Sequence, residues 1–380
     1  MDDLSLHAHL IGQQGSRSAL NTPVLVLDID KLDRNIATMQ AFANARGVGL
    51  RPHAKTHKSV DIAKRQIAAG AVGLCCAKIG EAEALADGGI TGLLITSPVS
   101  APAAIERLAA LAKRGIGLMA VIDNPDMVAR WQDALASAGA MLDVVIDVDP
   151  GIRRTGVASP EAAVAVAEAI ARSSSLTYRG VQYYCGSQQH IEDYAARHNA
   201  IVERTDYLRT VIAALTGAGY PPEIITGSGT GTHHIDLELG VFTELQAGSY
   251  VFMDKQYLDC DLADGPAPPF ETSLAVDARV VSANHAALVT IDAGYKSLST
   301  DGGAAQVQRG APTDSMFVFM GDEHAALVSP DIGVRLRPGD AVSLTVPHCD
   351  PTVNLYDYYH VVRDDTLTTI WPVSARGRAR

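Results

Sequence analysis

Lys55 lies in a basic run at residues 51–58, Arg-Pro-His-Ala-Lys-Thr-His-Lys, at the point where one β/α unit leads into the next. A lysine amine in such a place can hold a carbonyl cofactor as a Schiff base. An aldehyde cofactor such as pyridoxal phosphate then supplies its own electron sink, and the protein needs only to bind and orient it. A lysine beside His53 and His57 is also typical of a solvated basic corner. The run alone leaves both interpretations open.

A glycine-rich run at residues 226–232, Thr-Gly-Ser-Gly-Thr-Gly-Thr, is the second group that could do chemistry. Glycines let backbone N–H groups approach an anion closely, and hydroxyls add donors, so Thr226, Gly229, Thr230 and Gly231 predict a phosphate cup. The alternative is a flexible loop. The run is not the dinucleotide-binding fingerprint, because it follows a late strand and lacks the acidic partner of that motif.

The third group is the segment 346–357, in which His348, Cys349 and Asp350 precede a proline. In an extended segment, residues i and i+2 point to the same side, so His348 and Asp350 are expected to face together and Cys349 to face away. An imidazole and a carboxylate suit Mn²⁺, Mg²⁺, Co²⁺ or Zn²⁺, with water or substrate completing the shell. Two alternatives are a zinc pair of His348 with Cys349 and a hydrogen-bonded turn without metal.

These three groups are far apart in the sequence, so the fold must bring them together if they form one site. From residue 22 onward, short apolar runs alternate with amphipathic ones, which predicts parallel strands joined by crossover helices. Eight such strands are expected to close a (β/α)8 barrel of the TIM type, and an open doubly wound sheet is the alternative. The predicted strands are residues 24–27, 49–51, 72–76, 92–96, 117–122, 143–148, 178–184 and 223–226.

Helical periodicity ends after about residue 259, where a turn-rich stretch at 263–269 leads into short β-prone runs. These runs are separated by Gly, Asn, Asp and Pro, which is typical of antiparallel strands. We therefore expect an α/β fold of two domains: a barrel over residues 22–258 and a mostly antiparallel β-domain over 259–380, with the tail 1–21 lying against it. The second set of predicted strands is 273–281, 287–291, 316–320, 341–346, 358–362 and 367–371.

Composition narrows the class of function. The chain has 380 residues, of which 47% are hydrophobic, and a formal net charge of −12 with scattered basic residues. This argues against a nucleic-acid surface and favours a small-molecule enzyme. The five cysteines show neither a disulfide framework nor zinc-finger spacing, which indicates a reducing cytoplasm. No apolar stretch of signal-peptide or membrane-span length is present, so no membrane is expected as a partner.

Together, the run at 51–58, the glycine-rich loop with residues 243–250 after it, and the segment 348–357 resemble the D-threonine aldolases. These belong to the fold-type III pyridoxal-phosphate enzymes, with alanine racemase and eukaryotic D-serine dehydratase. The resemblance runs from about residue 22 to residue 376. It implies a β/α barrel that carries pyridoxal 5'-phosphate, a β-domain, a homodimer and a divalent metal.

The resemblance also implies roles for individual residues. Lys55 matches the Schiff-base lysine, and His348 and Asp350 match the metal pair, which favours Asp350 over Cys349 as a ligand. D-Serine dehydratases carry His-x-Cys there, so Asp350 favours the aldolase branch. The matching cofactor contacts are Arg154 and Tyr184 at the ring, Gly229, Thr230 and Gly231 in the phosphate loop, and Tyr250 near that loop.

Two positions depart from the family pattern. Cys185 stands where the threonine aldolases carry a histidine after the ring-contact tyrosine, and Ala325 follows Asp-Glu-His where many read glycine. We expect the first departure to lie close to the substrate. Because a relative that acts on 3-hydroxy-D-aspartate also lacks that histidine, both D-threonine and 3-hydroxy-D-aspartate stay open as substrates.

The implied reaction is retro-aldol cleavage of a β-hydroxy-D-amino acid to glycine and an aldehyde. The metal would lower the pKa of the hydroxyl, and His53 or metal-bound hydroxide would take its proton. Arg154, which is always charged, would modulate the ring nitrogen without protonating it fully. The nearest alternative is a dehydratase that forms a keto acid and ammonia. A racemase, a cofactor-storing protein and a metal-dependent hydrolase are further alternatives.

Overall fold

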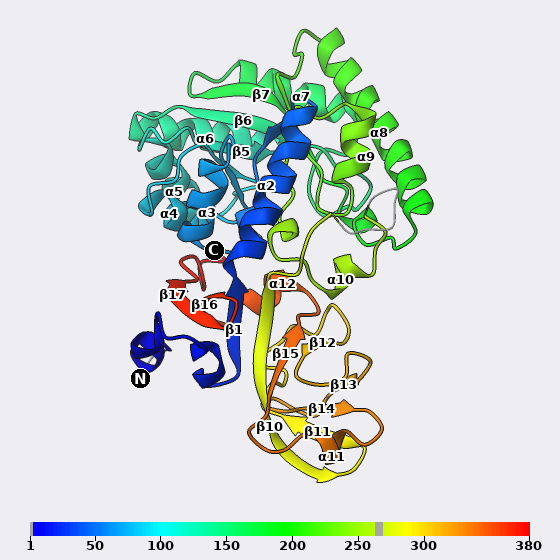
Figure 1. Ribbon diagram of the computed structural model, residues 1–380. Helices are drawn as coiled ribbons and strands as arrows, with labels where there is room; N and C mark the ends of the chain where they lie inside the picture. The colour runs from blue at the N-terminus through cyan, green and yellow to red at the C-terminus, as the bar shows by residue number, and fades with distance from the viewer. Residues whose placement is uncertain (1–2, 263–268) are drawn as a thin grey trace.

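The computed structural model describes residues 3–262 and 269–380, and these form two regions (Figure 1). A sheet of eight parallel strands with helices around it makes the upper region of Figure 1, and a nine-stranded, mostly antiparallel sheet makes the lower one. The expected barrel and β-domain are therefore both present. Most of the turn-rich stretch predicted at 263–269 lies outside the described residues.

The eight-stranded sheet has the order β2-β9-β8-β7-β6-β5-β4-β3 and is parallel throughout. Hydrogen bonds from Val72 N–H to the Leu50 carbonyl and from Cys75 N–H to the Pro52 carbonyl join β2 to β3 and close the barrel. Its strands are β2 (Gly49–Leu50), β3 (Leu74–Cys76), β4 (Leu93–Ile95), β5 (Met119–Ile122), β6 (Leu142–Asp147), β7 (Leu176–Tyr183), β8 (Ile224–Gly227) and β9 (Glu244–Leu245).

The barrel helices start where the sequence offers caps. The Asp28 side chain accepts a hydrogen bond from Lys31 N–H, and Ser59 and Asp193 cap α3 and α8 in the same way. The helices of this region are α2 (Ile29–Ala45), α3 (Val60–Ala68), α4 (Ile79–Asp87), α5 (Pro102–Ala112), α6 (Pro125–Ala138), α7 (Pro160–Ala171), α8 (Tyr194–Gly217), α9 (His233–Leu239) and α10 (Lys255–Leu258), with short 3-10 turns η3 (Ala54–Thr56), η4 (Gly186–Gln188) and η5 (Ser249–Val251).

The prediction that residues 24–27 open the barrel is wrong. That strand, β1 (Val24–Asp28), pairs with β10 and β16 of the other sheet, and the eighth barrel strand is the short β9. A continuous apolar run buried on both faces has the same pattern in either sheet, so periodicity alone does not assign it. Two residues of β9 carry too little pattern to be recognised as a strand.

The second sheet has the order β13-β14-β11-β10-β1-β16-β17, and β15 pairs with both β10 and β12. Short helices α11 (Ile332–Arg335) and α12 (Cys349–Val353) lie between its strands. The sequence did not predict β12 and β14. The strands are β10 (Leu274–His285), β11 (Leu288–Ile291), β12 (Gln306–Arg309), β13 (Met316–Phe319), β14 (Ala325–Val328), β15 (Ala341–Thr345), β16 (Tyr358–Arg363) and β17 (Thr366–Pro372).

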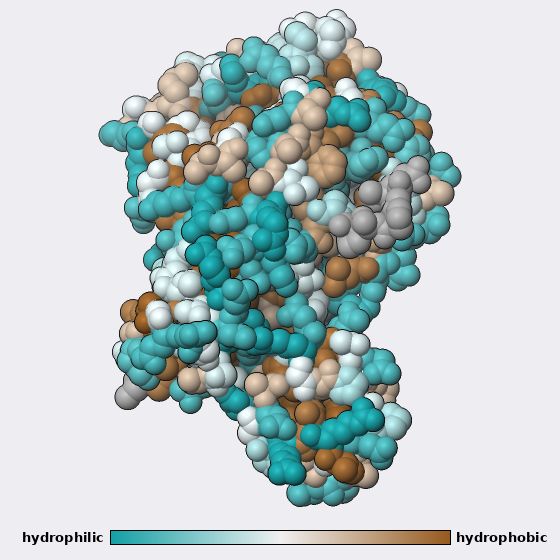
Figure 2. Space-filling model, in the orientation of Figure 1, coloured by the Kyte–Doolittle hydropathy of each residue, from teal (hydrophilic) through white to brown (hydrophobic). Residues whose placement is uncertain are grey.

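Hydrophilic and hydrophobic residues are unevenly distributed over the visible surface. Figure 2 shows hydrophilic residues over most of the visible face, with hydrophobic residues gathered near the lower tip of the β-domain. Among the exposed hydrophobic side chains are Met316, Val318 and Met320 in and after β13. Within residues 3–262 and 269–380, no helix has the length and apolar character needed to cross a bilayer.

The N-terminal segment, α1 (Asp3–His7), η1 (Ala8–Leu10) and η2 (Ser16–Ala19), packs against β16 and β17. His7 Nδ1 lies 2.8 Å from His360 Nε2 of β16, and both imidazoles are buried. Burial, together with the neighbouring His7, lowers the pKa of His360 to about 4. The folded chain therefore favours the uncharged form of His360.

This contact predicts an acid-sensitive contribution to stability. In the unfolded chain His360 takes up a proton below about pH 6.5, whereas the folded chain resists it until about pH 4. The free energy of unfolding should therefore fall between pH 7 and 5 by about 1 to 2 kcal/mol more in the wild type than in His360→Gln. Urea unfolding at both pH values measures the difference. His285→Gln, at an exposed histidine, is the control, and equal losses in the wild type and His360→Gln would contradict the prediction.

Candidate active site

A cavity of about 750 Å³ opens at the carboxyl end of the barrel strands. This is the end at which β/α barrels carry their catalytic groups. Of the predicted site residues, the structure brings six together in its wall: His53, Lys55, Arg154, Tyr184, Gly229 and Thr230. They come from the segments after β2, β6, β7 and β8, which are far apart in the sequence.

Lys55 is held by the turn η3, which packs against α12 of the β-domain. Its Nζ donates to Asp350 Oδ1 at 2.5 Å. Burial alone would lower the pKa of the Lys55 amine, but the Asp350 carboxylate outweighs burial and the pKa is raised. Lys55 is therefore an ammonium group that faces the cavity from the junction of the two domains.

His348 and Asp350 face each other, although the predicted reason is wrong. Residues 349–353 form the helix α12 rather than an extended segment, and His348 is its extended N-cap residue. Even so, His348 Nε2 lies 3.6 Å from Asp350 Oδ2. A helix beginning between the two residues brings their side chains together as alternation along a strand would.

Asp350 is the centre of a dense polar cluster. Its carboxylate accepts from Lys55 and, at 3.2 Å and 3.4 Å, from the hydroxyls of Thr56 and Ser249. Burial would raise its pKa, but the Lys55 charge and the His348 hydrogen bond hold the pKa of Asp350 well below its usual range. Asp350 is thus ionised and available to a cation.

His348 is oriented from its other side. Its Nδ1 lies 2.8 Å from Asp301 Oδ2, so Nε2 is the nitrogen directed at Asp350. Carboxylates that fix the far nitrogen of a metal-binding histidine are common in metal sites. Burial would lower the pKa of His348, but hydrogen bonds to Asp350 and Asp301 raise it to about 9.

The His348 and Asp350 donors fit a divalent metal ion. One nitrogen and one oxygen 3.6 Å apart can both reach an ion at about 2.1 Å, with water or substrate filling the other positions. Over the described ranges 3–262 and 269–380, no group of three or more His, Cys, Asp or Glu side chains that could hold a metal comes together. The pair would therefore form an open site.

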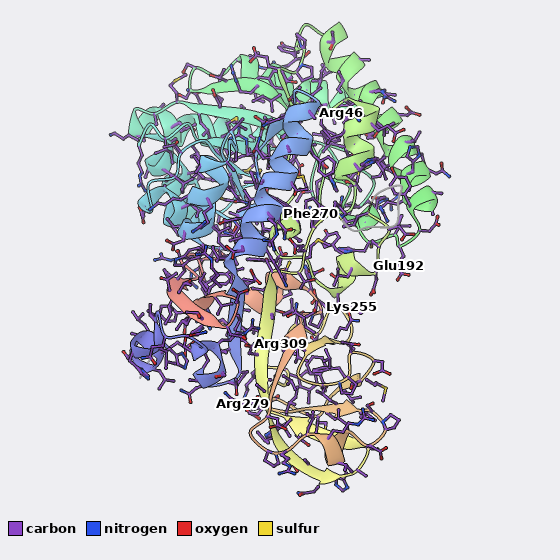
Figure 3. All side chains as sticks on the ribbon, viewed as in Figure 1. Arg46, Glu192, Lys255, Phe270, Arg279 and Arg309 are labelled. Atoms are coloured by element: carbon purple, nitrogen blue, oxygen red, sulfur yellow. The ribbon has the colours of Figure 1, made fainter. Side chains whose placement is uncertain are left out.

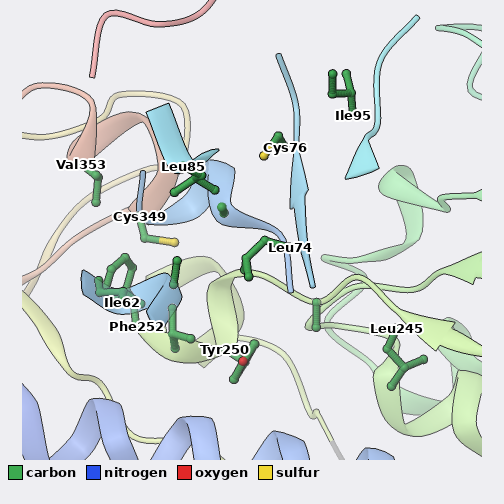
Figure 4. Packing of buried hydrophobic residues seen from close by; sticks show 14 of the residues in the cluster. Ile62, Leu74, Cys76, Leu85, Ile95, Leu245, Tyr250, Phe252, Cys349 and Val353 are labelled. Atoms are coloured by element: carbon green, nitrogen blue, oxygen red, sulfur yellow. The ribbon is translucent and has the colours of Figure 1, made fainter. Parts of the chain in front are cut away.

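Cys349 is not part of this donor set. Its side chain lies among buried hydrophobic residues, with Val353 of the same helix in the same cluster (Figure 4). Burial and the nearby Asp254 carboxylate raise the pKa of the Cys349 thiol well above its usual range. The Cys349 thiol donates to Asp350 Oδ2 at 3.5 Å. The facing pair of His348 Nε2 and Asp350 Oδ2 is therefore favoured over the alternative zinc pair of His348 and Cys349.

Arg154 and Tyr184 form a second pair in the cavity wall. The Arg154 guanidinium carbon lies 5.8 Å from the centroid of the Tyr184 ring, within cation–π range. This contact orients a permanent positive charge and a flat ring toward the same space. Together with the Lys55 amine and the Thr230 and Ser249 hydroxyls, they fit an aromatic, phosphorylated aldehyde.

The glycine-rich loop differs from the predicted phosphate cup. The N–H groups of Gly229 and Gly231 donate to Thr232 Oγ1 and Gln189 Oε1, so neither is directed at an anion. Gly229 and Thr230 line the cavity, whereas Thr226, Gly231 and Tyr250 do not. Tyr250 N–H instead donates to Thr230 Oγ1 at 2.9 Å, and Thr226 Oγ1 accepts from Gln246. These residues therefore support the loop from the side away from the cavity.

Comparison with known proteins agrees with this geometry. Residues 27–256 match the family described as alanine racemase, N-terminal domain, and residues 273–362 match the family described as putative serine dehydratase domain. The 3-hydroxy-D-aspartate aldolase of Paracoccus denitrificans (strain Pd 1222) is 38% identical over 365 residues, which cover 95% of this chain and 93% of that protein. The chain belongs to the family of the D-threonine and 3-hydroxy-D-aspartate aldolases.

A solved structure and a more distant relative complete the comparison. The crystal structure of D-threonine aldolase from Filomicrobium marinum superimposes with a TM-score of 0.91 at 37% identity, covering 96% of this chain and 97% of that one. A D-threo-3-hydroxyaspartate dehydratase of Delftia sp. (strain HT23) is 29% identical, over 94% of this chain and 98% of that protein. The aldolases are thus more similar in sequence to this chain than that dehydratase is.

The prediction that Cys185, the departure from the aldolase pattern, lies close to the substrate is not supported by its surroundings. Its side chain is buried and does not line the cavity. Burial and the Asp236 carboxylate raise the pKa of its thiol. Cys185 is therefore a packing residue in this aldolase family member.

His190 is a histidine to which the sequence assigned no role. Its ring lies 4.5 Å from the Tyr257 ring, centroid to centroid, and Tyr257 lines the cavity. Burial, and then the charges of His348 and Lys55, lower the pKa of His190 to about 4. An uncharged imidazole therefore lies beside Tyr257, which lines the cavity. Its position soon after β7 was the only signal in the sequence.

The loop that carries His190 is fixed to the segment that follows α10. Asp261 N–H donates to the Glu192 carbonyl at 3.0 Å, and the buried Arg197 donates to the Ile191 and Asp261 carbonyls. Figure 3 marks Glu192 and Lys255 at this edge, where the barrel meets the β-domain. These contacts fix the backbone immediately after His190.

His53 lines the cavity, but both of its ring nitrogens already have partners. Its Nε2 lies 3.0 Å from Thr96 Oγ1, and its Nδ1 accepts from Lys55 N–H at 3.3 Å. Burial and the Lys55 charge lower the pKa of His53 well below its usual value. Both ring nitrogens are thus engaged in supporting the barrel mouth and the backbone of Lys55.

Proposed function

We propose that this protein catalyses the retro-aldol cleavage of a β-hydroxy-D-amino acid to glycine and an aldehyde, using pyridoxal 5'-phosphate and a divalent metal ion. The observation that carries the proposal is the direct contact between Lys55 and Asp350, which joins a candidate cofactor lysine to a candidate metal pair. A dehydratase is the main alternative. Asp350, rather than a cysteine, favours the aldolase.

Lys55 would hold the cofactor through its ε-amino group. Arg154 and Tyr184 would contact the ring, and Gly229 and Thr230 would border the phosphate, with Thr226, Gly231 and Tyr250 supporting that loop. When bound, pyridoxal phosphate supplies an electron sink for the charge left on Cα when the Cα–Cβ bond breaks. The protein's own contribution is to bind the amino acid so that its β-hydroxyl points away from the barrel, toward the β-domain.

His348 and Asp350 would hold the metal, and Mn²⁺, Mg²⁺, Co²⁺ and Zn²⁺ all suit one nitrogen and one oxygen donor. A divalent ion there supplies Lewis-acid chemistry that lowers the pKa of a bound hydroxyl. Asp301 would keep His348 Nε2 directed at the ion. Ser249 and Thr56 would keep the Asp350 carboxylate in place.

We propose His190, rather than His53, as the group that takes the proton from the β-hydroxyl. A base must be unprotonated and near the reacting group. His190 is uncharged and packs against Tyr257 of the cavity wall, whereas both nitrogens of His53 have partners in the barrel. His53 then serves to position Lys55.

Substitution of His190 and substitution of His53 are expected to have different effects on kcat and on cofactor binding. His190→Ala should lower kcat by about 10²- to 10⁴-fold, the range for removal of a general base, with little change in cofactor binding. His53→Ala should weaken cofactor binding more than it lowers kcat of the saturated enzyme. Steady-state kinetics at saturating pyridoxal phosphate separate these effects. An enzyme that keeps its kcat in His190→Ala and loses it in His53→Ala would assign the base to His53.

A product assay tests the activity. Purified protein with pyridoxal phosphate and Mn²⁺ or Mg²⁺ should convert D-threonine to glycine and acetaldehyde, and 3-hydroxy-D-aspartate to glycine and glyoxylate. L-Threonine is the stereochemical control and should give no glycine. Keto acid and ammonia without glycine would support the dehydratase instead.

Assembly and location are proposed on the same basis. The family resemblance supports a homodimer. The five cysteines are all unpaired and buried, which supports a reducing cytoplasm as the place of action.

A further inference from the structure

Gln189 lies behind the glycine-rich loop, where that loop meets the segment after β7. Its side chain is fully buried. Its Oε1 accepts from Gly231 N–H at 3.0 Å, and its Nε2 donates to the Cys185 carbonyl and to Thr232 Oγ1, each at 3.1 Å. One amide group therefore joins the two loops that border the cavity.

Two glycines of the loop are required by the close approach of Gln189. A Cβ on Gly229 would lie 2.4 Å from Gln189 Oε1, and a Cβ on Gly231 would lie 2.0 Å from the Gln189 carbonyl oxygen. Real Cβ contacts are not that short. The glycines at these two positions thus make room for Gln189 on the side of the loop away from the cavity.

The hydrogen-bond network of Gln189 extends through Thr232 to Asp236. Thr232 Oγ1 accepts from Gln189 and from Gly229 N–H, and it donates to Asp236 Oδ2 at 2.6 Å. A hydroxyl offers one donor and two acceptor positions, so this one is fully used. Removing the Gln189 amide would leave several buried groups without a partner, and the loop would have to move to satisfy them.

On the opposite side, the same loop faces the cavity. Gly229 and Thr230 line it, whereas Gln189 does not. Gln189 also precedes His190 and follows Tyr184 by only five residues, so one side chain is coupled to the loop, to a ring contact and to the candidate base. It touches none of the reacting atoms and acts through its neighbours.

We infer that Gln189 is a positioning residue, which holds the glycine-rich loop in the shape that binds the phosphate group of the cofactor. The inference rests on the proposed pyridoxal phosphate site. Loss of Gln189 should affect the binding of the phosphate group and not of the rest of the cofactor, because the Gln189 hydrogen bonds reach the loop and not the Lys55 side of the cavity.

The test compares the binding of pyridoxal phosphate and of pyridoxal, which lacks the phosphate, to the cofactor-free protein by absorbance titration. In Gln189→Ala, the Kd of pyridoxal phosphate should rise about 10- to 100-fold, whereas the Kd of pyridoxal should change by less than about twofold. Gln188→Ala is the matched control, because that neighbouring side-chain amide oxygen has no hydrogen-bond partner in the described part of the chain. It should bind both ligands as the wild type does.

Gln189→Glu is the second variant, and thermal unfolding shows whether each variant folds. It keeps an oxygen for Gly231 N–H but loses both donors and adds a negative charge, so it should also weaken only the phosphorylated ligand. If Gln189→Ala does not fold, the binding of the two ligands to Gln189→Glu is the test. An unchanged Kd for pyridoxal phosphate, or an equal loss for pyridoxal, would overturn the inference. A wild type that binds no pyridoxal phosphate would instead refute the proposed function, and the inference with it.

Discussion

Lys55→Ala is expected to lower the rate of glycine formation by about 10⁴-fold or more, the scale at which a nucleophile's removal is felt. Without the ε-amino group the cofactor has no covalent anchor, and the amine that faces the cavity is lost. The measurement is glycine released from a β-hydroxy-D-amino acid at saturating pyridoxal phosphate. The absorbance band of cofactor bound through an amine should also disappear.

The matched control is Lys64→Ala, an exposed lysine in the helix that follows the same segment. It should keep wild-type activity and the wild-type spectrum. Lys55→Ala also removes the partner of Asp350, so the circular dichroism of both variants must show a folded barrel. Glycine formation that survives in a folded Lys55→Ala variant would assign the cofactor to another group.

His348→Ala and Asp350→Asn are expected to lower activity by about 10²- to 10³-fold, and to remove its dependence on added Mn²⁺. The loss corresponds to several kcal/mol of charge stabilisation at the developing alkoxide. Asp350→Asn keeps the size of the side chain and removes only its charge. Rates measured across a Mn²⁺ titration, after treatment with a chelator, check both parts of the prediction.

His285→Ala, at an exposed histidine of the β-domain, controls for the loss of an imidazole elsewhere. It should leave the Mn²⁺ titration unchanged. If His348→Ala kept both full activity and its response to Mn²⁺, the metal would lie elsewhere or have no part in the reaction.

Much of the fold could be predicted because the sequence patterns that indicate it are local. The alternation of apolar and amphipathic runs predicts the barrel, and Lys55, Arg154 and Tyr184 lie at strand ends, which meet at one mouth. A parallel sheet forces this outcome, since its strands end together. The loss of helical periodicity after residue 259 likewise predicts the β-domain.

What could not be predicted depends on contacts between distant segments. β1 lies in the second sheet because its edges are paired by β10 and β16, and nothing within residues 24–28 carries that information. In the glycine-rich loop, the Gly231 N–H donates to Gln189, which is about 40 residues earlier in the chain. His190 became a candidate base only because the fold places it against Tyr257, which lines the cavity.

The site also shows how a correct expectation can rest on an incorrect reason. His348 and Asp350 do face each other, but through a helix start rather than through an extended strand. Spacing alone could not distinguish the two, since both bring residues i and i+2 within reach.

The most direct test of the account is the division of products from 3-hydroxy-D-aspartate. With pyridoxal phosphate and Mn²⁺ present, one assay mixture is analysed for glycine and glyoxylate, and for oxaloacetate and ammonia. We expect glycine and glyoxylate in equal amounts, with ammonia no higher than in a Lys55→Ala control. Oxaloacetate and ammonia in equal amounts, without glycine, would contradict it.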